Sequence, residues 1–133
     1  MSRGAGAGAG RRALLCLAAA ALWWAPPAHS HAVLVRSVPA SRAALKEAPA
    51  RVQLWFSERL EPAFSSLGVW SAAEAQVDLR DASVASDDPK RLSVTLAPLG
   101  PGSYTVRYRV LSVDGHIVDS RFSFTIRGGA PPR

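Results

Sequence analysis

The chain has 133 residues, of which 48% are apolar, and its 16 basic and 10 acidic residues give a formal net charge of +6. Three of the basic residues and none of the acidic ones lie in the first 30 residues, so the rest carries 13 basic against 10 acidic residues, a net charge of +3. These basic residues are scattered rather than clustered, which argues against a nucleic-acid partner.

Residues 1–30 have the three parts of a secretory signal: a basic start, an apolar run over 13–25 and a small-residue exit at 28–30. The run of about 13 apolar residues is shorter than the roughly 20 that cross a bilayer. We therefore expect an exported protein, periplasmic or extracellular, that does not span a membrane. Because Arg11-Arg12 resembles a twin-arginine signal, the export route stays open.

The only cysteine, Cys16, and the only methionine, Met1, both fall inside this signal. The exported chain would then contain no sulfur, so it can form no disulfide and offers no thiolate or thioether to a soft metal ion. A catalytic cysteine is excluded for the same reason. Cleavage after Ser30 would leave 103 of the 133 residues, enough for one small domain.

Alternation of apolar and polar residues predicts strands, because successive side chains of a strand point to opposite faces. In chain order the strand patterns are 32–37, 51–56, 67–71, 76–79, 91–97, 104–110 and 121–127, with one short helical turn over 41–46. The patterns at 51–56, 91–97, 104–110 and 121–127 are the most regular.

About seven strands in roughly 100 residues, separated by turn signals and without long helices, predict an all-β fold. We expect an antiparallel Greek-key barrel or sandwich over residues 31–127, followed by a frayed tail over 128–133. Trp55 and Trp70 lie in strand patterns, and we expect them to pack or to be partly exposed rather than to serve as ligand platforms.

Two histidines remain after residue 30, and each has a feature that suits metal binding. If cleavage follows Ser30, His31 is the first residue, and a terminal histidine can chelate one metal ion through its α-amine and ring Nδ1. His116 follows Asp114-Gly115, and in an extended strand Asp114 and His116 project to the same side. Together these groups offer three nitrogens and one oxygen, a donor set that suits Cu(II).

Each feature also has an ordinary explanation. Asp-Gly often marks a hairpin turn, some residue must come first in any exported chain, and cleavage after Ala28 would place His29 first. Without a metal the chain would be a structural or adhesive β-sandwich. Copper held by a terminal histidine and a second histidine also resembles the histidine brace of lytic polysaccharide monooxygenases, so an oxidative enzyme is a further alternative.

Three stretches, in this order after the signal, resemble the CopC family of exported copper-binding proteins: HAVLVRSVPA, VQLWFSERLEPAF and YTVRYRVLSVDGHIVDSRFSFTI. The resemblance implies a Greek-key β-barrel with an immunoglobulin-like strand arrangement. It also implies one Cu(II) ion bound through His31, Asp114 and His116. Glu58 matches a carboxylate near that site, where it could accept a hydrogen bond from a ligand, although an exposed acid beside Arg59 is an equal alternative.

The function that the resemblance implies is non-enzymatic. A monomeric carrier or buffer would sequester copper outside the cytoplasm, for homeostasis or resistance, or pass it to a membrane transporter. Some family members bind Cu(I) at a separate methionine-rich site, which this chain cannot form because it has no methionine after residue 30. Ser120 stands where many relatives have glycine.

Overall fold

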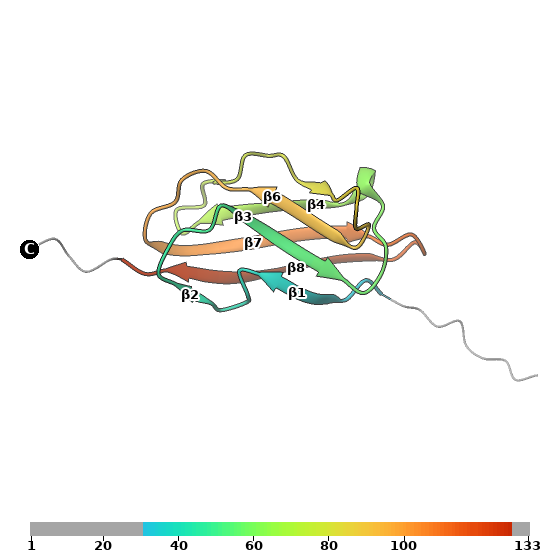
Figure 1. Cartoon of the computed structure of the whole chain (residues 1–133), viewed down its shortest axis with the longest axis horizontal. Coiled ribbons are helices and arrows are strands. Elements are labelled where there is room, and N and C mark those ends of the chain that lie inside the picture. Colours follow the sequence, from blue (N-terminus) through green and yellow to red (C-terminus); the bar gives the residue numbers. More distant parts are fainter. Residues whose placement is uncertain (1–30, 129–133) are drawn as a thin grey trace, which may run out of the picture.

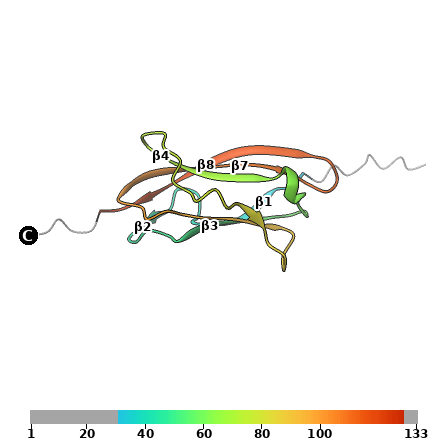
Figure 2. The same ribbon diagram turned by 90° about the horizontal axis from the view of Figure 1, so that it is seen from above.

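The computed structural model describes residues 31–128, which form two four-stranded β-sheets packed face to face (Figures 1 and 2). One sheet has the strand order β1-β3-β6-β5, and the other has the order β2-β8-β7-β4. The elements are β1 (Leu34–Val38), β2 (Ala44–Leu45), β3 (Arg51–Phe56), the 3-10 turn η1 (Pro62–Phe64), β4 (Ser66–Ser71), β5 (Ser83–Val84), β6 (Arg91–Thr95), β7 (Gly102–Leu111) and β8 (Ile117–Ile126).

The strand order is that of an immunoglobulin-like Greek key, as predicted. Strands β1, β3, β6 and β5 take the places of A, B, E and D, and β4, β7 and β8 take those of C, F and G. The pairs are antiparallel except that the short β2 runs parallel to the end of β8. Strands β7 and β8 form a long hairpin from Gly102↔Ile126 to Leu111↔Ile117, so the loop 112–116 lies at its tip.

Alternate side chains of the central strands fill the space between the sheets. Val52, Leu54 and Phe56 of β3 are at most 2% exposed, and burying each such side chain contributes roughly 1.5–3 kcal/mol. Tyr104, near the start of β7, donates its hydroxyl hydrogen to the Gly100 carbonyl oxygen at 2.6 Å. This bond is the tyrosine corner that is typical of immunoglobulin-like sandwiches.

The regular strand patterns are confirmed: 51–56 forms β3 with the predicted bounds, 104–110 lies within β7, and 91–97 and 121–127 overlap β6 and β8 but extend past their ends by two residues and one. The helical turn predicted over 41–46 is wrong. Arg42 has a φ of +64°, which a helix does not allow, and Ala44 and Leu45 form β2. The 3-10 turn η1 was not predicted.

The strand predicted over 76–79 is also wrong. Gln76 and Asp78 make only isolated bridges, to Trp70 and Leu96. The buried Asp78 carboxylate accepts hydrogen bonds from the backbone amides of Val69 and Arg80, at 2.8 and 2.9 Å. A side chain that bonds the amide two residues later bends the chain, which interrupts a regular ladder.

Trp55 and Trp70 are half-buried, as expected of strand residues. The guanidinium of Arg36 lies 4.6 Å from the Trp55 ring centre, and that of Arg107 lies 4.6 Å from the Trp70 ring centre. Within the described residues no helix is long and apolar enough to span a membrane. The predicted signal over 1–30 and residues 129–133 lie outside that part of the chain.

Candidate metal centre

The two histidines singled out in the sequence meet at one end of the sandwich. His31 lies just before β1, and His116 lies in the loop at the tip of the β7–β8 hairpin, which Figures 1 and 2 both place beside the start of β1. Their imidazole centroids are 4.7 Å apart, with the ring planes inclined at 75°. Residues 85 positions apart in the sequence therefore bring their imidazole rings into contact.

Asp114 joins His116 through a turn, and not through the extended strand that we expected. Its Oδ1 lies 3.2 Å from His116 Nδ1, with 34% and 29% of the two side chains exposed. Gly115 between them has a φ of +93°, a conformation that side chains other than glycine rarely adopt. The interpretation of Asp-Gly as a hairpin turn is thus confirmed, and this turn also brings the carboxylate to the imidazole.

Ser112, which the sequence analysis did not single out, holds this loop together. Its side chain is fully buried and donates a hydrogen bond to Asp114 Oδ1. The same hydroxyl oxygen accepts from the His116 amide at 3.3 Å and lies 3.2 Å from the His116 carbonyl oxygen. The serine of the Ser-x-Asp-Gly-His pattern therefore contacts both residues proposed as ligands, and its place in that pattern was the available signal.

Ser57 holds the segment around His31 as Ser112 holds the loop around His116. Its hydroxyl accepts a hydrogen bond from the Val33 amide at 2.9 Å and donates to the His31 carbonyl oxygen at 3.2 Å. Its own amide donates to the Val33 carbonyl oxygen at 2.8 Å. The serine of the Phe-Ser-Glu pattern thus anchors the segment that carries His31. A search for ligand-type side chains alone overlooks this serine.

Glu58, predicted near the site, is half-buried directly after Ser57. Among the described residues its carboxylate takes part in no hydrogen bond or ion pair. Its role toward a ligand stays a prediction.

The arrangement offers two imidazoles and one carboxylate, a nitrogen and oxygen donor set without sulfur. Such a set suits Cu(II), Zn(II) or Ni(II) and disfavours Cu(I), which prefers thiolates and thioethers. Within residues 31–128 no three His, Cys, Asp or Glu side chains are already spaced as a complete metal-binding cluster. A metal ion bound here would draw in the Asp114 carboxylate or take a further donor.

Comparisons of the sequence with known proteins identify a family and several relatives. Residues 34–127 match the CopC domain family. The chain is 35% identical to protein YobA of Escherichia coli K12 over 103 residues, covering 77% of this chain and 83% of YobA. It is 31% identical to copper resistance protein C of Pseudomonas syringae pv. tomato over 123 residues, covering 88% and 97% of the two chains.

The fold is similar to that of a solved relative as well. The crystal structure of CopC from Methylosinus trichosporium OB3b superposes with a TM-score of 0.71 at 33% sequence identity. The match covers 77% of this chain and the whole of that one. At this identity the likeness extends beyond the fold to the sequence that builds it.

Proposed function

The chain belongs to the CopC family, and from this premise we propose that it is an exported protein that binds one Cu(II) ion. His31, Asp114 and His116 would hold the ion at the end of the sandwich. Sequestration of copper, for homeostasis or resistance, or its delivery to a membrane transporter, would be the function. Such a protein works as a monomer and need not catalyse a reaction.

The contact between the two imidazoles carries this proposal. Nitrogen ligands lie about 2.0 Å from such a metal ion, which puts the centre of each imidazole ring about 3.2 Å from the ion. If the two rings lie in directions from the ion that make a right angle, their centres are about 4.5 Å apart. The observed separation of 4.7 Å is close to this value. This separation supports the proposal that His31 and His116 are neighbouring ligands of one ion.

The proposal includes the α-amine of His31, freed when the signal is removed after Ser30. The amine and ring Nδ1 of one residue close a six-membered chelate ring, which an internal histidine cannot form. His116 would supply the third nitrogen and Asp114 the oxygen, giving the N,O set that Cu(II) prefers. Because the amine must lose a proton to bind, copper affinity should weaken as the pH falls below its usual pKa of about 7.7 to 8.0.

Copper titration of the exported form tests this proposal. Protein with His31 as its first residue should bind one Cu(II) ion in equilibrium dialysis and give the paramagnetic resonance signal of nitrogen ligation. His116→Ala should bind Cu(II) more weakly and change that signal, because one of the three nitrogen ligands is lost. One glycine added before His31 should weaken binding severely, because the amine becomes an amide.

The matched control carries the same extra glycine after Arg133, where it should leave copper binding unchanged. Equal and weak binding by the wild type and His116→Ala would reject the copper site and favour a structural sandwich. Unchanged affinity on extension before His31 would remove the amine from the ligand set.

A further inference from the structure

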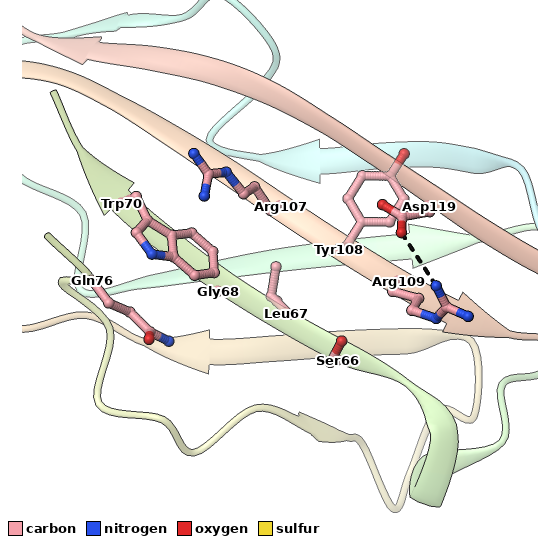
Figure 3. Close-up of a pocket in the computed structure, with 9 residues that line it drawn as sticks. All are labelled: Ser66, Leu67, Gly68, Trp70, Gln76, Arg107, Tyr108, Arg109 and Asp119. Atoms are coloured by element: carbon pink, nitrogen blue, oxygen red, sulfur yellow. Dashed lines mark hydrogen bonds and ion pairs between the residues drawn. The ribbon is translucent and has the colours of Figure 1, made fainter. Parts of the chain in front are cut away.

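The outer face of the β2-β8-β7-β4 sheet has a second feature, which the copper proposal does not use. Ser66, Gly68 and Trp70 of β4 lie beside Arg109, Arg107 and Thr105 of β7, in that register. A hollow of about 220 Å³ lies over this part of the sheet, lined by residues that include Trp70, Gln76, Arg107 and Arg109 (Figure 3). A second hollow of about 270 Å³, over β7 and β8, shares Arg107 and Asp119 with the first.

Trp70, which lines the first hollow, packs where a side chain at Gly68 would stand. A Cβ atom at this position would lie 2.6 and 2.7 Å from two ring carbons of Trp70, closer than real atoms approach. The glycine therefore lets the indole lie over the strand, with Arg107 stacked on it. In Figure 3 the indole of Trp70 and the guanidinium of Arg109 stand on opposite sides of Gly68 and Leu67.

The charges on this face favour an anion. Arg107 and Arg109 line the hollow, and Arg121 lies directly across from Arg107 in the strand register. Glu74 and Asp119 are the two carboxylates paired with them, and among the described residues Arg121 has no ion pair. A third carboxylate, the buried Asp78, lies with its Oδ2 3.3 Å from where a Gly68 Cβ atom would stand, and accepts from the Val69 and Arg80 amides. The positive charge that faces no paired carboxylate on this surface is therefore that of Arg121.

The existing pairs leave guanidinium hydrogens for a ligand. Arg109 Nη1 and Asp119 Oδ2 are 3.5 Å apart, at the outer limit of a hydrogen bond, and 58% and 69% of the two side chains are exposed. Such exposed pairs are weak and exchange readily. An incoming carboxylate could therefore pair with Arg109 through two parallel hydrogen bonds, the geometry that a guanidinium favours.

From these observations we propose that the hollow at Gly68 binds a small organic acid, with its carboxylate on Arg109 and Arg107 and a flat apolar body beside the Trp70 ring. A volume of about 220 Å³ corresponds to about seven water molecules' share of liquid, which is the size of a small molecule. Aromatic and arginine side chains together recognise a planar body that bears a carboxylate.

Nuclear magnetic resonance titration of the metal-free protein with benzoate tests this site. The backbone amides of Gly68, Arg107 and Arg109 should shift saturably at millimolar benzoate. Benzamide has the same shape without the charge and should bind about 10-fold more weakly, the loss expected when a charge-assisted hydrogen bond is removed. Inorganic phosphate tests the contribution of charge alone and should also bind more weakly.

Arg109→Gln should lose the benzoate shifts, whereas Arg36→Gln should keep them. Arg36 is a matched control because it stacks on Trp55 at the same 4.6 Å, on the other sheet. Absence of saturable shifts in wild type, or equal shifts in Arg109→Gln, would overturn the site. Benzamide binding as well as benzoate would overturn the anionic ligand, and phosphate binding as well as benzoate would overturn the flat apolar body.

Discussion

At the scale of single residues, the site depends on side chains that would not themselves touch a metal ion. Ser112 bonds the Asp114 carboxylate and the His116 backbone, and Ser57 bonds the His31 carbonyl oxygen and the Val33 amide. Each serine fixes one of the two chain segments that carry a histidine. Removing either one would loosen the ligands without deleting a ligand.

Ser112→Ala tests this positioning role. We expect the Cu(II) affinity to fall about 10-fold, the usual effect of removing a group that orients a ligand. The free energy of unfolding should fall by about 1 kcal/mol, because one buried hydroxyl and its hydrogen bonds are lost. Competition titration measures the affinity, and denaturant unfolding of the metal-free protein measures the stability.

Ser120→Ala is the matched control, since Ser120 is an exposed serine of β8. It should change neither quantity. A purely structural serine would lower stability and leave the copper spectrum as it was. Loss of affinity together with an altered resonance spectrum would identify Ser112 as a positioning residue, and an unchanged affinity would contradict that role.

At the scale of elements, the β7–β8 hairpin determines where Asp114 and His116 meet. Its tip turns at Gly115, whose φ of +93° strains any other residue, although a Cβ atom there would meet nothing within 4 Å. The requirement for glycine is therefore conformational and not steric. This distinction can be measured by comparing Gly115 with a glycine that has free space and ordinary backbone angles.

Gly115→Ala should lower the free energy of unfolding by about 1–2 kcal/mol, the cost of forcing a side chain into a left-handed conformation. It should also weaken Cu(II) binding, because the turn that joins Asp114 to His116 must distort. Gly100→Ala is the control: a Cβ atom at Gly100 also meets nothing within 4 Å, and its φ lies outside the strained range. Equal effects of the two substitutions in thermal unfolding would show that the turn imposes no strain.

The elements also show what the sequence could predict. Strands β3 and β7 were predictable because their successive residues alternate between buried and more exposed positions over six or more residues. Residues 76–79 alternate in the same way but form no strand, because the buried Asp78 carboxylate takes the amides that a ladder would use. A local pattern cannot reveal a side chain that bonds the backbone of another strand.

The residues of the candidate site were also predictable only in part. The ligand-type residues His31, Asp114 and His116 could be chosen from chemistry and from resemblance, and the ring contact is consistent with the choice of the two histidines. Ser57 and Ser112 could not be chosen, because serine is common and only the fold shows which ones bond the segments around the site. The hollow at Gly68 was missed for a similar reason, since only the fold shows that the Trp70 indole packs over this glycine.

At the scale of the whole molecule, the proposed site joins the two sheets. His31 precedes β1 of one sheet, whereas His116 lies between β7 and β8 of the other. A metal ion held by both would add a connection between the two sheets, beside the core and the bridges that Gln76 and Asp78 make to Trp70 and Leu96. Copper should then bind the folded state far better than the unfolded chain, in which the two histidines are 85 positions apart.

Thermal unfolding with and without copper measures this connection. At a free Cu(II) concentration 100 times the Kd, mass action adds about 2.7 kcal/mol to the free energy of unfolding. For a domain of this size each kcal/mol raises the Tm by roughly 4–8 °C, so we expect a rise of about 10 °C or more. His116→Ala should unfold at nearly the same temperature with and without the metal.

Hydrogen exchange separates a true connection from binding at one segment alone. If the ion joins the sheets, amides of residues 32–35 and of the loop 112–116 should both become more protected on adding copper, because opening either one would break the same site. Protection confined to the loop, with a small rise in Tm, would mean that His31 is not a ligand. Protection of both segments in the wild type and of neither in His116→Ala would be the result expected of one shared ion.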